Sequence, residues 1–317
     1  MDRPVRSRLA SLSDFQFGAV ATETIEDALL HLAQQNEQAV QEAAGRMGSF
    51  RETRIVEFVF LLSEQWCLEK SVSYQAVEIL ERFMVKQAEN MHRQAMVQLS
   101  EKKEPQNWKA LKEQLSSKFV LRLVSCVQLA SKLSFHYKTL GYVHSKEELL
   151  ESELDVLKSL NFQINLPTPL AYVEMLLEVL GYNGCLVPAT QLHATCLTLL
   201  DLVYLLHEPI YESLLRASIE NSVPSQLQGE KFVSVKEDFM LLAVGIIAAS
   251  AFIQNHECWS QVVGHLHSIT GIALESIAEL SYAILTHSVG ANTPARQQPA
   301  PPHLEARALR AAAASNT

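Results

Sequence analysis

Apolar residues recur at spacings of three and four along most of the chain, and this periodicity constrains the fold more than any other feature. Side chains at these spacings share one face of an α-helix. Alternating β-branched runs, which would indicate strands, are nearly absent, and Asn183-Gly184 is the lone dipeptide typical of a tight hairpin turn. The sequence therefore predicts an all-α protein.

The first half of the chain is predicted to contain four helices separated by polar sequence. The apolar stripes place them at Thr24–Ala43, Arg54–Leu68, from an N-cap at Ser73 through Met84, and Leu115–Leu133. The last of these is apolar on almost all sides, which is typical of a helix at the centre of a bundle. Residues Gln87 to Gln114 are polar, and we interpret them as a solvated insertion or a weak helix.

Two local signals divide the second half of the chain. Ser145 and Glu148 have the spacing of a capping box, so a helix is expected to begin there. Thr168 followed by Pro169 indicates an N-cap and a first-turn proline that start another helix through Leu180. Five further helices are expected near Pro188–His207, Ile210–Glu220, Lys236–Gln254, Cys258–Ser268 and Leu274–His287.

These patterns predict four regions. Residues 1–50 form an N-terminal segment with one helix, 51–166 a first helical domain, 167–289 a second helical domain, and 290–317 a tail. The tail is rich in Pro, Ala, Gln and Arg, so it has too little apolar surface to offset the entropy of ordering and is expected to be disordered.

The charge and composition exclude several classes of protein. A formal net charge of −9 opposes capture of phosphate backbones, so direct binding to nucleic acid is not expected. No run approaches the roughly 20 apolar residues of a membrane span, and no apolar run that would form a secretory signal follows the N-terminal arginines. The five scattered cysteines fit a reducing compartment, so we expect a cytosolic or nuclear protein without disulfides.

No constellation of residues indicates an enzyme, a metal site or a cofactor site. Gly-rich phosphate loops are absent, and carboxylates such as Glu147 and Glu151 recur as on a solvated helix face. His193 and Cys196 stand one helical turn apart, but a closed zinc site needs a second pair of ligands. We therefore expect neither catalysis nor a bound metal or cofactor.

Three motifs resemble the cyclin family. RLVSCVQLASK at Arg122–Lys132 is similar to the central helix of the first cyclin box, and YQAVEILERFMVK at Tyr74–Lys86 to its second helix. Lys146–Val173 resembles the helix that ends in L-x-F before a PTP-type linker. The resemblance covers roughly Arg54 to Ile253, and it implies a double helical-bundle fold with residues 51–166 as the N-terminal cyclin box.

The resemblance also indicates a candidate partner-binding surface at Cys67, Leu68, Lys70, Lys132, Ser134 and Phe135. In ordinary cyclins, as the resemblance implies, a lysine and a glutamate hold the mobile helix of a kinase. We map these two positions onto Cys67 and Ser134, which lack the charges for such a clamp. Lys70 could partly substitute for the lysine. The family's substrate-docking patch maps onto Arg51–Ile55, where charge replaces apolar surface.

The first cyclin box is predicted to be short of one helix. Twelve residues, LSFHYKTLGYVH, lie between Lys132 and Ser145, where the family has a loop and a whole helix. The fourth helix of this box is therefore expected to be missing or shortened, and a splice form would explain the difference.

The resemblance extends to cyclin relatives that act in the maturation of crossover sites on meiotic chromosomes. It implies a nuclear, chromosome-associated scaffold that binds meiotic recombination proteins, and it leaves open a second pool of the protein in the cytoplasm. The alternative is a regulatory subunit that activates a cyclin-dependent kinase.

Overall fold

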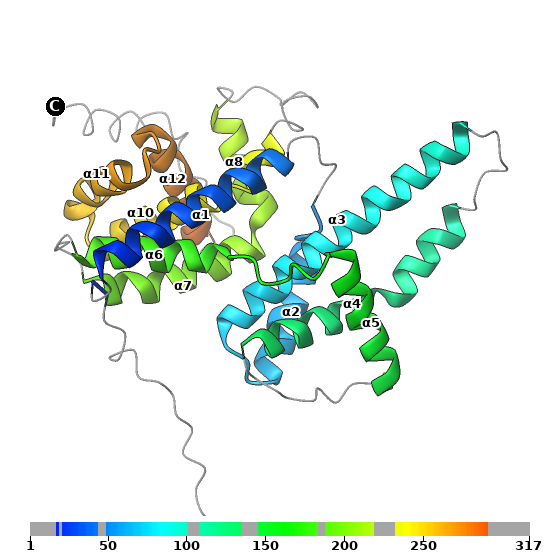
Figure 1. Cartoon of the computed structure of the whole chain (residues 1–317). Helices are drawn as coiled ribbons and strands as arrows, with labels where there is room; N and C mark the ends of the chain where they lie inside the picture. The colour runs from blue at the N-terminus through cyan, green and yellow to red at the C-terminus, as the bar shows by residue number, and fades with distance from the viewer. Residues whose placement is uncertain are drawn as a thin grey trace, which may run out of the picture. The chain divides into compact units, whose positions relative to one another are not determined.

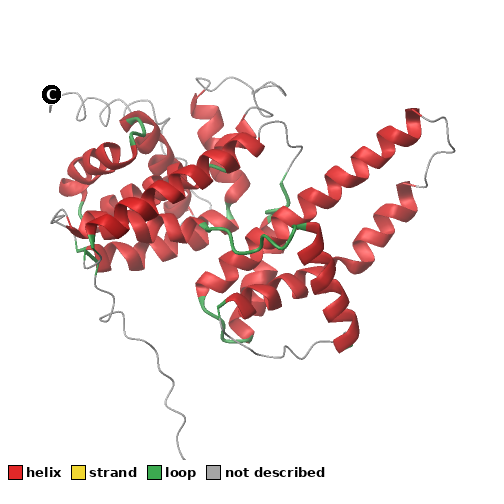
Figure 2. Cartoon of the chain, in the orientation of Figure 1, coloured by secondary structure: helices red, strands yellow, loops and turns green. Residues whose placement is uncertain are grey.

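A computed structural model describes residues 17–18, 21–43, 49–100, 108–134, 145–182, 188–218 and 232–290. The described residues form helices joined by short loops and contain no strand (Figures 1 and 2). The prediction of an all-α protein is therefore confirmed. Contacts divide the chain into two compact units. Unit 1 comprises residues 1–45, 169–203 and 209–317, and unit 2 comprises residues 46–168 and 204–208.

Unit 2 is built from four helices within its described residues. They are α2 (Thr53–Gln65), α3 (Lys70–Ser100), α4 (Trp108–Leu133) and α5 (Lys146–Ser159). Helix α4 packs against α3, α5 and α2, which makes it the centre of the bundle. Its apolar side chains are buried where these helices meet, as predicted for this helix: Leu123, Val124, Cys126, Val127, Leu129 and Ala130.

The prediction for the start of α3 was wrong, and of the two interpretations of Gln87–Gln114 the structure shows a helix at residues 87–100 and 108–114. Ser73 does not cap this helix but is buried inside it, because the helix begins at Lys70. The helix also continues through Ser100, and α4 already begins at Trp108. Lys, Gln, Glu, Met and Ala have high helix propensity, so the polar sequence at the end of α3 and at the start of α4 is itself helical. Residues 101–107 lie outside the described part.

The capping box at the start of α5 is confirmed. The Ser145 side chain accepts a hydrogen bond from the Glu148 backbone N–H at 3.2 Å. The Ser145 backbone N–H donates in turn to the Glu148 carboxylate at 2.9 Å. These reciprocal bonds satisfy two of the free amides at the helix start, and they fix the first residue of α5.

Unit 1 is organised around a nearly apolar helix. Helix α10 (Phe239–Gln254) contacts α6, α11, α12 and α1, and all its residues from Leu242 to Ala251 are buried. The other elements are α1 (Thr22–Ala43), α6 (Pro169–Tyr182), α7 (Ala189–Leu205), α8 (His207–Ser218), η2 (His256–Cys258), α11 (Trp259–Thr270) and α12 (Leu274–Gly290). Apart from η2, a short 3-10 turn, these helices begin and end within a few residues of the predicted positions.

Helix α1 belongs to unit 1, and Figure 1 shows it alongside α6 and α10. Its apolar face buries Ile25 and Leu32, and the Tyr172 hydroxyl donates to the Leu32 carbonyl at 3.1 Å. Asn36 donates to Asp238 at 2.8 Å and accepts from the Met240 backbone N–H at 3.1 Å. This helix thus helps to cap α10, which sequence spacing could not show.

The chain passes between the two units at four points. The units divide between Thr168 and Pro169, and the α7–α8 corner, Tyr204–Glu208, groups with unit 2. The predicted tail lies outside the described residues from position 291 onward, as does the predicted gap at positions 135–144. Among the described residues, no single helix is both long and apolar enough to span a membrane; α7 and α8 reach that length only as a pair bent by 88°.

Candidate protein-binding surface

The structure places five of the six predicted surface residues, and they lie at two helix ends of unit 2. Lys132 and Ser134 lie at the C-terminal end of α4. Cys67, Leu68 and Lys70 lie at the corner between α2 and α3. Phe135 lies outside the described residues. Helices α2 and α4 contact each other, but the partner that the structure gives to Lys132 comes from α5.

Lys132 forms an ion pair with a carboxylate that sequence reasoning missed. Its ammonium group lies 2.7 Å from both carboxylate oxygens of Glu153. The Glu153 side chain is buried, whereas the Lys132 side chain is 38% exposed. The ammonium group therefore neutralises a buried charge from the edge of the surface. A signal was present in the sequence, because Glu153 follows Leu149 and precedes Val156 at helical spacing on the buried face.

Two further polar contacts fix α5 against α4. The Arg122 guanidinium pairs with Asp155 at 3.1 Å and also lies over the Phe83 ring, 5.1 Å from its centroid. Deeper in the interface, the Ser125 hydroxyl donates to the Ser152 hydroxyl at 2.8 Å. These contacts hold the outer face of α5 in a defined orientation.

That outer face exposes apolar side chains. Leu150 and Leu154 are 48% and 43% exposed, and they stand one helical turn apart on α5. We call this pair the α5 stripe. The exposed acidic residues Glu147 and Glu151 lie beside it on the same helix. The face therefore combines apolar contact area with negative charge, which suits an apolar partner surface with a basic rim.

The corner that contains Cys67 is a Schellman motif. The Leu68 backbone N–H donates to the Ser63 carbonyl at 2.9 Å, and the Cys67 N–H donates to the Glu64 carbonyl at 2.9 Å. This pattern needs a left-handed residue after the helix, and Cys67 has a φ of 52°. Cys67 is exposed and Leu68 is half-buried. The corner is thus a helix stop that presents a thiol to solvent.

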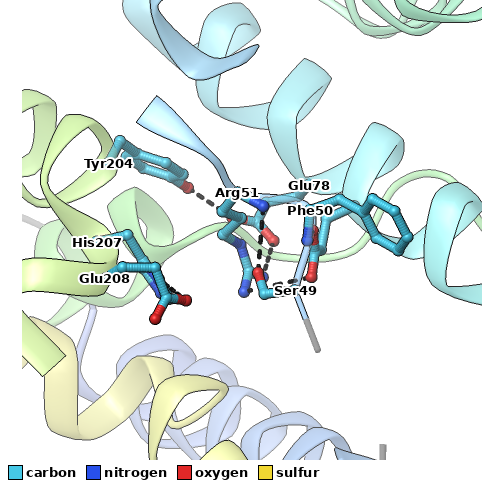
Figure 3. Close-up of polar contacts among 8 residues, drawn as sticks. Ser49, Phe50, Arg51, Glu78, Tyr204, His207 and Glu208 are labelled. Atoms are coloured by element: carbon cyan, nitrogen blue, oxygen red, sulfur yellow. Dashed lines mark hydrogen bonds and ion pairs between the residues drawn. The ribbon is translucent and has the colours of Figure 1, made fainter. Parts of the chain in front are cut away.

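A buried charged cluster occupies another part of unit 2 (Figure 3). The Arg51 guanidinium lies 2.7 Å from Glu78, and the Tyr204 hydroxyl donates to the other oxygen of Glu78 at 2.9 Å. Glu81 accepts from the Phe50 backbone N–H at 2.7 Å. All of these charged side chains are buried. Arg51, the first residue of the segment onto which the family's docking patch maps, therefore lies in the interior, whereas Arg54 of the same segment is exposed.

Aromatic rings complete this cluster. Tyr204 stacks on Tyr74 with ring centroids 4.9 Å apart, and Phe60 meets both rings edge-on. Burial, and next the nearby Glu78 carboxylate, raise the pKa of Tyr204 well above its ordinary value. The phenol therefore stays protonated and keeps donating to Glu78 at neutral pH. The cluster fastens residues 50–51 and the α7–α8 corner to α3, which is a structural role.

The residues weighed as half of a zinc site have other partners in unit 1. His193 Nε2 lies 3.2 Å from the Glu174 carboxylate, and Cys196 Sγ lies 3.2 Å from the Ser250 hydroxyl. Within the part of the chain that the structure describes, His, Cys, Asp and Glu form no group of three or more that could hold a metal ion.

Comparison with known proteins decides the family. No family model matches the sequence. The chain is 82% identical to cyclin N-terminal domain-containing protein 1 from Mus musculus, over 100% of this chain and 99% of that protein. It is 81% identical to the protein of the same name from Homo sapiens, over 100% of both. The chain belongs to the family of cyclin N-terminal domain-containing protein 1.

Members of the cyclin N-terminal domain-containing protein 1 family differ from this chain in length. The match to the human relative extends over 330 residues, whereas this chain has 317, a difference of 13. The human relative thus has residues that this chain lacks. A difference of this size would accommodate the helix predicted to be missing between Lys132 and Ser145, and its location in the chain stays a prediction.

Proposed function

We propose that the chain is a non-enzymatic scaffold of cyclin fold that acts in the nucleus, on meiotic chromosomes, by binding proteins of crossover recombination. Membership of the cyclin N-terminal domain-containing protein 1 family supports the cyclin part of this proposal. The resemblance drawn from the sequence motifs supports the role in crossover maturation and designation. A net charge of −9 favours contact with proteins over direct contact with DNA.

The α5 stripe is the observation that carries the binding role. Leu150 and Leu154 leave apolar area in water on a helix that is itself firmly held by Lys132 and Arg122. A rigid, exposed apolar pair bordered by acidic side chains is typical of a protein-binding surface in the absence of its partner. We assign to it a partner segment with apolar side chains and basic neighbours.

The state of the perturbed ionisable groups supports a role without catalysis. Burial raises the pKa of the Cys126 thiol and raises the pKa of the Cys196 thiol to about 12. Both thiols are therefore protonated and screened from substrates at neutral pH, and thiols in that state are poor nucleophiles. The buried phenol of Tyr204 is likewise engaged in a structural hydrogen bond.

The binding proposal is tested by placing charge on the α5 stripe. Leu150→Glu with Leu154→Glu is compared with the wild-type chain and with Leu30→Glu, which changes a leucine that is 60% exposed on α1. Each chain is used to capture crossover-recombination proteins from nuclear extracts of spermatocytes, and the bound proteins are quantified. We expect the double variant to lose at least about tenfold in capture, while Leu30→Glu retains it. Equal capture by all three would remove the α5 stripe as the binding surface.

A second candidate function is activation of a cyclin-dependent kinase. The Lys132–Glu153 pair favours it, because it places a lysine at the end of α4, two residues before Ser134, against a carboxylate from α5. The surface would be the one around Leu68, Lys132 and Phe135. Co-purification with the kinase, followed by an activity assay, separates the two functions: the scaffold binds without stimulating phosphorylation, whereas a regulatory subunit stimulates it.

A further inference from the structure

The chain ahead of α1 makes a specific contact with unit 1. The ring of Phe17 packs on the ring of His193 in α7, with centroids 5.4 Å apart and planes inclined by 53°. Both residues belong to unit 1, although 176 positions separate them in the sequence. An aromatic pair of this geometry contributes attraction beyond its buried area. The segment is thus held by a defined side-chain contact.

Glycine at position 181 of α6 permits this contact. A Cβ added to Gly181 would lie 2.9 Å from the carbonyl carbon of Phe17 and 3.0 Å from the amide nitrogen of Gly18. Real side chains do not approach backbone atoms this closely, and backbone cannot move aside as a flexible side chain can. The surface of α6 is therefore hollow at the one place where the Phe17–Gly18 backbone crosses it.

Gly18 is also required by its own conformation. Its φ is 84°, in the left-handed region that glycine adopts without steric penalty. The turn at Gly18 follows directly after the residue whose ring meets His193. A phenylalanine followed by a glycine is thus the local sequence that fits this surface.

The surface that Phe17 contacts is rigid because His193 is held by its contact with Glu174. His193 is buried, with 5% of its surface exposed, and its Nε2 atom lies 3.2 Å from the Glu174 carboxylate. Glu174 belongs to α6 and His193 to α7, so the two helices hold the imidazole between them. A ring whose orientation is set in advance loses little entropy when an aromatic partner packs on it.

We propose that Gly181, His193 and Glu174 form a binding site for a peptide segment with the sequence Phe-Gly, occupied in this chain by its own Phe17–Gly18. A partner protein with an exposed Phe-Gly segment would bind the same site once the chain's own segment has left it. The attached segment competes strongly, because three residues separate Gly18 from α1 and its effective concentration is therefore in the range of ~1 mM or more. The site acts as a docking position that the chain keeps closed to weak ligands.

The test uses the full chain labelled with nitrogen-15 and a synthetic peptide of residues 14–21. Phe17→Ala in the chain empties the site, and the peptide is titrated to about 5 mM, above the effective concentration of the attached segment. The amide signals of Gly181 and His193 report binding. We expect them to shift saturably, and we expect the wild-type chain to need at least about tenfold more peptide for the same shift, because its own Phe17 competes.

Two variants make the result specific. Gly181→Ala, added to the Phe17→Ala chain, should weaken binding of the peptide at least tenfold. This substitution should preserve folding because alanine favours the α6 helix more than glycine does. The peptide with its own Phe17→Ala should bind at least tenfold more weakly, and this change leaves the chain untouched. Equal titrations by the two peptides would overturn the proposal, as would the absence of any shift at about 5 mM in the Phe17→Ala chain.

Discussion

Two helix ends in unit 2 use residues other than glycine in the left-handed conformation. Cys67 follows α2 with a φ of 52°, and Asn161 follows α5 with a φ of 50°. Asparagine tolerates this region better than most residues, whereas a cysteine there strains its Cβ against the backbone. No glycine marks the stop after α2 in the sequence, so the predicted end at Leu68 lies three residues beyond the end of the helix at Gln65.

Replacing Cys67 with glycine tests this strain. Cys67→Gly removes the Cβ at a left-handed position, and we expect the free energy of unfolding to rise by roughly 0.5–1 kcal/mol. The Cys67 side chain is exposed, so the substitution removes little buried surface. Urea denaturation measures the change, with Cys67→Ala as the control that keeps the Cβ. A stability of Cys67→Gly at or below that of Cys67→Ala would contradict the assignment of strain.

The Lys132–Glu153 pair makes a second prediction at this scale. Lys132→Met leaves the buried Glu153 carboxylate without its cation, so we expect a loss of about 1–2 kcal/mol, moderated by the partial exposure of Lys132. Lys86→Met is the matched control, because Lys86 pairs with Glu89 on the surface at 3.7 Å. The control should change stability by less than about 0.5 kcal/mol. Equal effects would show that the buried carboxylate does not depend on Lys132.

At the scale of elements, the same physics explains which helices could be predicted. The capping box at Ser145 and the apolar spacing of α4 are local signals, and the structure confirms both. The true length of α3 was missed, because its end beyond Met84 is polar and periodicity reports only buried faces. Glu153 was missed as the partner of Lys132 for a related reason: the two residues lie 21 positions apart on different helices.

Helix packing in unit 1 makes a prediction with an internal control. A Cβ at Gly245 would lie 2.8 Å from the Leu280 side chain, whereas a Cβ at Gly264 would meet nothing within 4 Å. Gly245→Ala should therefore overpack the contact between α10 and α12 and lower stability by about 1–3 kcal/mol. Gly264→Ala, inside α11, should raise it by up to about 1 kcal/mol. Thermal and urea unfolding measure the change in stability of both variants. If the two changes have the same sign, the contact with Leu280 is unimportant.

Across the whole molecule, several buried groups are held in their protonated forms. Burial, and next the Asp238 carboxylate, raise the pKa of Tyr172 to about 12. Burial raises the pKa of Cys196 from an ordinary value of 9.0 to about 12, and it raises the pKa of Cys126 further. These groups lie in both units, so their titration affects the stability of the chain as a whole.

This distribution predicts loss of stability at alkaline pH. Above pH 9 the unfolded chain releases these protons while the folded chain keeps them, so the unfolded state binds fewer protons and stability falls as pH rises. The stabilisation that these protonated groups provide is fully present below pH 9. Above pH 9, each fully buried group lowers the free energy of unfolding by roughly 1 kcal/mol per pH unit. Urea denaturation between pH 8 and about 11 measures the slope. Cys196→Ala should flatten it, and an unchanged slope in that variant would contradict the assignment.

The sequence predicts two helical domains, whereas the exact residues that group into each unit depend on contacts between distant parts of the chain. The linker at Thr168–Pro169 is where the two units divide. The inclusion of Tyr204–Glu208 in unit 2 depends on Tyr204 reaching Glu78, 126 positions away. The docking of Phe17 on His193 depends likewise on a long-range contact. Contacts of this kind are set by tertiary packing. The spacing of apolar residues in a single sequence reports local helices and does not show which distant residues meet.

We propose that this cyclin-fold chain binds partners without switching on a kinase. The most direct measurement is the rate of phosphate transfer from ATP to a protein substrate by purified cyclin-dependent kinases, with and without the purified full chain. We expect the same rate in both cases, including for any kinase that co-purifies with the chain. A rate that rises in proportion to the chain bound, and falls again with Lys132→Met, would contradict the scaffold and establish a regulatory subunit.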